Sequence, residues 1–145
     1  MEIIIRLSTL LVIFLSFSAF GQERTITLNE LPSTAQTFIS KNFPNQAASY
    51  VEEDKGIMNT DYKVLLTGGT EIEFDGKGNW EEIDGNKKAI PNTVLPQKIT
   101  SYVASNYKGQ GVEKIEKESW GYQIELLSGL EIEFDNNGKF LRIDD

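Results

Sequence analysis

Apolar residues of helical period occur twice in the chain, and each stripe is followed by short stretches of alternating apolar and polar residues. The first stripe has spacings of i, i+4, i+7, i+8 and i+12 and consists of Leu31, Ala35, Phe38, Ile39 and Phe43. The second stripe has the same spacings and consists of Leu95, Ile99, Tyr102, Val103 and Tyr107. One-sided stripes of this kind predict two helices that each lie on another element.

Four strand signals follow each predicted helix. In the first set they cover about residues 48–53, 62–66, 70–74 and 80–83, and in the second set about 112–117, 122–126, 130–134 and 140–143. Turn residues separate them, and the links are too short for crossovers, so the strands are predicted to pair antiparallel. The segment 54–61 (DKGIMNTD) is expected to form a longer hairpin loop.

The two sets are copies of one pattern. Residues 62–84 read YKVLLTGGTEIEFDGKGNWEEID, and residues 122–144 read YQIELLSGLEIEFDNNGKFLRID, at a constant offset of 60. The helices match at an offset of 64. The sequence therefore predicts an α+β fold built by tandem duplication of a helix plus a four-stranded antiparallel unit, about 31–84 and 95–144. A unit of this size is marginal alone, and two can share one core.

Alternation assigns the two faces of the predicted sheet. Ile72 and Phe74 point towards the helices, whereas the polar residues of the repeated EIEFD strands point away: Glu71, Glu73, Asp75, Glu131, Glu133 and Asp135. In the fourth strand, Trp80 and Ile83 have opposite parity, so either one is exposed or a β-bulge intervenes. Aromatic candidates for the open face are Trp80, Phe140, Trp120 and Tyr50; alternatively, they pack at the sheet margins or beneath the helices.

The N-terminal segment and the charge limit the function classes. Residues 1–21 have one basic residue, an uncharged apolar run and small residues before Gln22, which is typical of a cleaved signal peptide. An uncleaved anchor is the alternative. Residues 22–145 are then one exported domain, periplasmic or secreted. The net charge of −8 argues against nucleic acid and anionic membranes as partners.

Chemistry in this chain has to rely on carboxylates, because there is no histidine or cysteine. This excludes Ser-His-Asp and Cys-His catalysis and His- or Cys-based metal sites. Acid pairs such as Glu71 and Glu73 could serve glycosidase-type chemistry, but acids alternating along a strand are typical of a solvated face. The segment 133–144 fits several positions of a calcium-binding loop, although a hairpin explains the same residues. No catalytic residue, metal site or cofactor is predicted.

The helix motif LP…FI..NF, the hairpins Y.V.L..G.EIEFD..GNW.EID and their repetition after a signal segment resemble the PepSY-like, β-lactamase-inhibitor-like family of proteins secreted by Bacteroidetes. The resemblance covers roughly residues 28–145. It implies a curved antiparallel sheet with two helices on one face. It supplies no catalytic residue, and it implies binding or inhibition only by analogy of fold.

The sequence thus leads to the hypothesis of an exported, non-catalytic binding module whose open sheet face recognises a protein or peptide, in the manner of an inhibitor. The binding residues expected on that face are Glu71, Glu73, Asp75, Trp80, Glu131, Glu133, Asp135 and Phe140. Two alternatives stay open. One is a carboxylate-based carbohydrate-active enzyme or module, and the other is an envelope protein that binds a small ligand or Ca²⁺.

Overall fold

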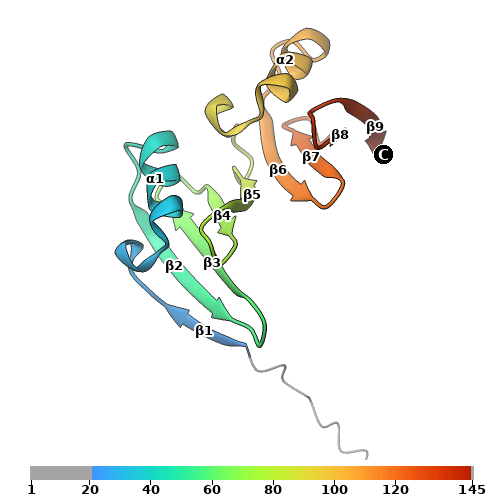
Figure 1. Cartoon of the computed structure of the whole chain (residues 1–145). Helices are drawn as coiled ribbons and strands as arrows, with labels where there is room; N and C mark the ends of the chain where they lie inside the picture. Colours follow the sequence, from blue (N-terminus) through green and yellow to red (C-terminus); the bar gives the residue numbers. More distant parts are fainter. Residues whose placement is uncertain (1–20, 145) are drawn as a thin grey trace, which may run out of the picture.

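The computed structural model describes residues 21–144, which form one nine-stranded antiparallel sheet and two α-helices (Figure 1). The strands lie in the sheet in the same order as in the chain. The first half contains β1 (Gln22–Thr25), the 3-10 turn η1 (Leu28–Glu30), α1 (Ser33–Asn42), β2 (Ala48–Lys55), β3 (Thr60–Leu66), β4 (Glu71–Phe74) and β5 (Trp80–Asp84). The second half contains η2 (Asn92–Val94), α2 (Gln97–Asn106), β6 (Val112–Glu118), β7 (Gly121–Leu126), β8 (Glu131–Asp135) and β9 (Phe140–Asp144). The predicted signal peptide, residues 1–21, lies almost wholly outside the described residues.

Both predicted helices are confirmed, and their apolar stripes form part of the core. Ala35 and Ile99 occupy equivalent positions in α1 and α2, and both are fully buried. Pro32 and Pro96 directly precede the two helices, where proline has no backbone hydrogen bond to lose. Each helix is followed directly by an aromatic residue whose amide donates to the carbonyl four residues earlier, Phe43 after α1 and Tyr107 after α2.

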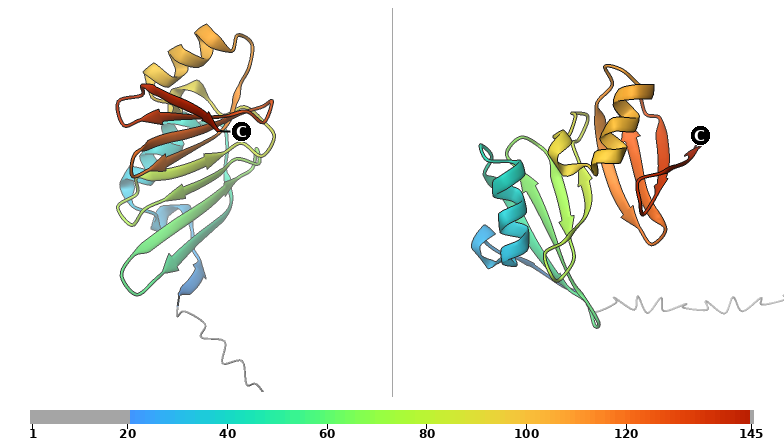
Figure 2. Two further views of the ribbon diagram at one scale, coloured as in Figure 1. Left: turned by 90° about the vertical axis from the view of Figure 1, so that its right-hand side faces the viewer. Right: turned by 45° about the horizontal axis from the view of Figure 1, so that its top comes forward.

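The two helices lie on the same face of the sheet (Figure 2). Phe38 of α1 meets the ring of Phe74 edge-on at 5.9 Å, and Tyr102 of α2 meets Phe134 in the same way at 5.2 Å. These contacts place the core between the helices and one side of the strands. The opposite side carries no helix among residues 21–144 and is called here the open face.

Strands β5 and β6 join the two halves into one sheet. Ile83 lies opposite Ile115, Asp84 opposite Lys114 and Glu82 opposite Glu116. The two isoleucines are fully buried on the helix-covered face. Burying a side chain of this size contributes about 1.5–3 kcal/mol, so the junction is an integral part of the core.

A β-bulge determines which residues of the fourth strand in each half face the helices. The register shifts between Glu73 and Phe74, so that Phe74 lies opposite Trp80 while Ile72 lies opposite Ile83. The extra residue, Glu81, lets Trp80 and Ile83 share the helix-covered face. The same shift recurs between Glu133 and Phe134 in the second half.

The structure adds one strand that the sequence pattern does not predict. β1 pairs antiparallel with β2, and all four of its residues are exposed. It has no apolar alternation to reveal it. An ion pair from Arg24 to the buried carboxylate of Glu53, at 3.0 Å, helps to hold it in place.

The β2–β3 hairpin accounts for the additional residues of the first half. The ladder continues to the pair Lys55 and Thr60, and the loop of residues 56–59 closes it. In the second half the corresponding ladder stops at Glu118 and Gly121, with only two residues between them. The insertion therefore lengthens both the strands and the loop. Ile57 and Met58 at its tip are almost fully exposed.

Two glycines of the first half allow a matched test of the turn that contacts α1. Gly78 has φ +86°, and an added Cβ would lie 2.8 Å from Cβ of Pro32. Gly69 has φ +93°, but an added Cβ would meet nothing within 4 Å. Gly69→Ala should cost about 1–2 kcal/mol for the left-handed backbone. Gly78→Ala should cost about 1–3 kcal/mol more, because α1 must also move. Urea denaturation measures both, and equal losses would show that the turn does not press on the helix.

Candidate functional site

The open face is strongly acidic along its whole length. One cross-strand row runs through Glu52, Lys63, Glu73, Glu82, Glu116, Gln123, Glu133 and Arg142. A neighbouring row runs through Glu71, Asp84, Lys114, Glu125, Glu131 and Asp144. These two rows contain ten carboxylates and three cations. The acidic net charge of the chain is thus concentrated on this side of the sheet.

Each of the three cations binds two carboxylate oxygens. Nζ of Lys63 lies 3.2 Å from Glu71 and 2.9 Å from Glu73. Nζ of Lys114 lies 2.9 Å from Glu82 and 2.7 Å from Glu116. The guanidinium of Arg142 binds both oxygens of Glu133 at 2.8 and 3.0 Å. These pairs neutralise only part of the face.

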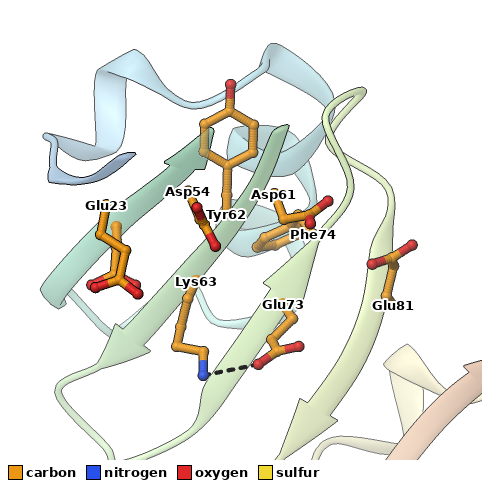
Figure 3. Close-up of a pocket in the computed structure, with 9 residues that line it drawn as sticks. Glu23, Asp54, Asp61, Tyr62, Lys63, Glu73, Phe74 and Glu81 are labelled. Carbon is orange, nitrogen blue, oxygen red and sulfur yellow. Dashed lines mark ion pairs between the residues drawn. The ribbon is translucent and has the colours of Figure 1, made fainter. Parts of the chain in front are cut away.

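Six carboxylates line a shallow pocket of about 270 Å³ over β2, β3 and β4 (Figure 3). Its charged lining consists of Glu23, Glu52, Asp54, Asp61, Lys63, Glu73 and Glu81. Lys63 is the single cation among them, and it is engaged by Glu73 (Figure 3). One oxygen of Asp54, Oδ1, is buried and accepts no hydrogen bond from the described residues.

Two acids of this pocket have raised pKa values. Burial raises the pKa of Asp61, and repulsion from Asp54, Asp75 and Glu73 raises it further. Burial likewise raises the pKa of Glu81, together with repulsion from Asp61 and other acids of this region. A partner that brought positive charge to the pocket would relieve this repulsion.

The second half builds the same strands without this pocket. The positions of Asp61 and Glu81 are taken by Gly121 and Leu141, at the offset of 60. Lys63 is replaced by Gln123, while the acid Glu73 recurs as Glu133. Because Gly121 and Leu141 occupy the equivalent places in β7 and β9, the fold does not require acids there. The fold therefore does not explain why the first half has acids at these two positions.

Comparison with known proteins decides the family. The model of the family described as "Putative beta-lactamase-inhibitor-like, PepSY-like" matches residues 21–64 and 59–142. The chain belongs to this PepSY-like family. A search among curated proteins finds no match.

Three solved structures from Bacteroides are similar to this PepSY-like chain over nearly their whole length. One from Bacteroides thetaiotaomicron, described as a "putative calcium-regulated periplasmic protein", is 32% identical with a TM-score of 0.80 and covers 85% of this chain and 97% of its own. One from Bacteroides vulgatus, described as a "putative periplasmic protein" of the DUF2874 family, is 36% identical with a TM-score of 0.80 and covers 86% of this chain and 98% of its own. A second one from B. vulgatus, of unknown function, is 38% identical with a TM-score of 0.79, covering 86% and 100%. Like these relatives, this chain is a periplasmic or secreted protein.

Four of the residues expected on the open face lie there, namely Glu71, Glu73, Glu131 and Glu133. Glu133 is nevertheless largely buried, because Arg142 covers it. Their role in binding remains a prediction. Asp75 and Asp135 lie at hairpin turns, where Oδ1 of each accepts two backbone amides at 2.9 Å. These two aspartates therefore serve to hold the turns.

The expected placement of Trp80 and Phe140 on the open face is wrong. Trp80 lies 6.5 Å from Phe38 of α1 and 6.4 Å from Tyr122. Phe140 stacks on Tyr102 of α2 at 5.2 Å. The bulge in each half turns these rings to the helix-covered side, as the alternative interpretation of the sequence allowed.

The sequence pattern did not identify three further acids that line the pocket, namely Asp54, Asp61 and Glu81. Asp54 and Asp61 face each other across the β2–β3 hairpin. The alternation of that hairpin could have indicated this pairing. Glu81 reaches the pocket because it is the extra residue of a bulge, and strict alternation does not predict its direction.

The geometry of residues 21–144 also bears on metal binding and on membrane crossing. No group of three or more Asp and Glu side chains there has an arrangement that could hold a metal ion. In the same range, none of the helices has the length and apolar character needed to cross a bilayer.

The pocket gives a test in which the effect of a mutation on stability disappears in acid. The raised pKa of Asp61 means that the folded protein binds its proton more tightly than the unfolded chain, so ionised Asp61 costs stability at neutral pH. Asp61→Asn should therefore raise Tm at pH 7. This gain should shrink as the pH falls through the raised pKa, and it should be absent below the ordinary value of 3.8.

Asp75→Asn is a control for which the opposite change in Tm is expected. Burial acts to raise the pKa of Asp75, but hydrogen bonds from Asn79 and Lys77 outweigh it and lower the pKa. Ionised Asp75 therefore stabilises the fold above its unfolded pKa, and this contribution is lost as the pH falls through the folded one. Asp75→Asn should lower Tm at pH 7 and have less effect in acid. Thermal unfolding by circular dichroism measures both variants, and a loss of Tm in Asp61→Asn at pH 7 would contradict the account.

Proposed function

We propose that this protein is an exported, non-catalytic binding module whose open sheet face recognises a polypeptide segment rich in lysine and arginine. The observation that carries the proposal is the crowding of carboxylates around Asp61 and Glu81 in a pocket with one engaged cation. Complementary charge steers association and suppresses wrong partners. The description of the family as inhibitor-like supports a protein partner, and the analogy is one of fold.

Tandem duplication is part of this proposal. The two halves repeat the order of 3-10 turn, helix and four strands, and the family model matches the chain in two segments. A duplicated unit provides a long, continuous sheet face. We propose that the second half mainly extends and supports this face, whereas the first half provides its most acidic part.

A catalytic role for the acid pairs has less support. Glycosidase-type chemistry needs one carboxyl group that is protonated and another that is ionised across a substrate. Glu71 and Glu73 instead both form an ion pair with the same Lys63 ammonium group. Their side chains are 35% and 39% exposed, so they are not enclosed in a cleft.

Defined peptides test the proposal. Residues 22–145 are titrated by calorimetry with a synthetic twelve-residue peptide of alternating lysine and serine, and with its counterpart of alternating glutamate and serine. We expect binding of the lysine peptide only, with an affinity that falls at least about tenfold between 0.05 and 0.5 M salt, because screening shortens the range of exposed charges. Equal binding of both peptides, or of neither, would refute this function.

The relative described as calcium-regulated suggests a second candidate, in which Ca²⁺ regulates the same face. Carboxylate oxygens are the ligands that Ca²⁺ takes in proteins. No three of them within residues 21–144 are arranged to hold a metal ion as they stand, so this candidate requires acids of the open face to move together when Ca²⁺ binds. Binding to the folded state alone would raise Tm with increasing Ca²⁺. Thermal unfolding at 0 to 10 mM CaCl₂, with MgCl₂ as the control, tests this. A calcium-specific rise that Asp61→Asn abolishes would favour it, and equal curves for the two salts would dismiss it.

A further inference from the structure

The last strand of the sheet has a free outer edge within the described residues. β9 pairs with β8 on one side, and none of residues 21–144 pairs with its other side. Its apolar residues remain half-exposed, with Phe140 at 36%, Leu141 at 47% and Ile143 at 42%. Free strand edges with apolar side chains are templates for pairing with another chain.

The inner junction shows what covers the equivalent strand. β5 occupies the place in the first half that β9 occupies in the second, and β6 pairs with its outer edge. There Ile83 is fully buried opposite Ile115, and Asp84 lies opposite a cation, Lys114. Ile143 and Asp144 stand at the positions of Ile83 and Asp84, so within residues 21–144 they lack the partner that their counterparts have.

We infer that β9 pairs antiparallel with β9 of a second copy of this chain, with Ile143 opposite Ile143. This register places Arg142 opposite Asp144 of the second copy, and by symmetry the same pair forms again. Residues 142, 143 and 144 then each lie opposite a favourable neighbour. The isoleucines meet on the helix-covered face, and two opposite-charge pairs form on the open face. The strand is self-complementary, as a two-fold interface requires.

Other registers are less favourable on the same grounds. Centring the pair on Arg142 opposes two guanidinium groups, and centring it on Asp144 opposes two carboxylates, both of which are destabilising. A shift by one residue would place the helix-covered side of one copy beside the open face of the other. The register through Ile143 is therefore the one in which faces and charges both agree.

A substitution that reverses the charge of one residue in β9 tests the pairing. Sedimentation velocity on residues 22–145 at 0.15 M salt, from 10 µM to 1 mM, should show a monomer–dimer equilibrium. Asp144→Arg should weaken the dimer at least tenfold, since Arg142 of each copy would then face a second guanidinium group instead of a carboxylate. Asp144 lies opposite Glu131 in its own sheet, so this substitution removes an acid–acid neighbour and should not lower the Tm of the monomer.

A mixture of two variants gives the decisive result. Arg142→Glu alone sets a new carboxylate opposite Asp144 of the second copy, so this variant should also be monomeric. When Arg142→Glu and Asp144→Arg are mixed, every opposed charge becomes complementary, so a heterodimer should form that neither variant gives alone. Circular dichroism of Arg142→Glu tests whether β9 survives the loss of its bond to the buried Glu133. If it does not, the result for Asp144→Arg alone decides. A monomeric wild-type protein at 1 mM, or a dimer that Asp144→Arg leaves unchanged, would overturn the inference.

Discussion

Replacement of Phe134 by alanine is expected to destabilise the protein by about 3–5 kcal/mol, which is a large share of the about 5–15 kcal/mol typical of a whole domain. Phe134 has no exposed surface, and it contacts both Tyr102 of α2 and Phe140 of β9. Alanine would leave a cavity where the helix rests on the sheet. Urea denaturation followed by tryptophan fluorescence and circular dichroism measures the loss.

Two further substitutions control this result. Phe74→Ala removes the equivalent ring beneath α1 and should cost a similar amount, because Phe74 is also fully buried. Phe140→Ala changes a ring that is 36% exposed at the sheet edge, so it should cost less than half as much. Since β5 and β6 join the halves into one core, each variant should unfold in a single transition. Separate transitions for the two halves would contradict the shared core.

Charge reversal in the pocket should produce the largest effect on binding. Asp61→Lys combined with Glu81→Lys is expected to weaken binding of the lysine–serine peptide by at least about tenfold, equivalent to about 1.4 kcal/mol. The two new ammonium groups would stand at positions where burial, and then repulsion from neighbouring carboxylates, raises the pKa of both side chains. Calorimetry under the conditions of the wild-type titration measures the change.

The matched control changes the same amount of charge elsewhere on the open face. Glu125→Lys combined with Glu131→Lys alters the net charge equally but lies on β7 and β8, outside the first-half pocket. If recognition is centred on that pocket, this control should weaken binding by less than about threefold. Equal losses in the two double variants would mean that only overall charge matters, and not the pocket.

Much of the fold follows from the chain pattern because each half is regular. The stripes through Leu31 and Leu95 predict both helices, and the alternation around Ile72 and Ile132 predicts which strand residues are buried. The exceptions arise where periodicity fails. β1 is polar throughout and is held by pairing with β2, and the bulges reverse the direction of Trp80 and Phe140.

The pocket was harder to predict from the sequence than the fold. Its lining depends on which residues lie opposite each other in neighbouring strands, and the sequence pattern does not give this strand register. Asp54 and Asp61 come together only because the β2–β3 ladder extends to Lys55 and Thr60. The repeated acids Glu73 and Glu133 were conspicuous because they recur. Asp61 and Glu81 stand where the two halves differ, and these positions distinguish the first-half pocket.

Mapping of the bound peptide by amide resonance shifts tests the central claim, that the acidic open face is the recognition surface. Titration of ¹⁵N-labelled residues 22–145 with the lysine–serine peptide should shift amides of β2, β3 and β4 around Asp61, Lys63 and Glu73, and leave α1 and α2 unchanged. Shifts confined to the helices, or no shift at millimolar peptide, would contradict the account.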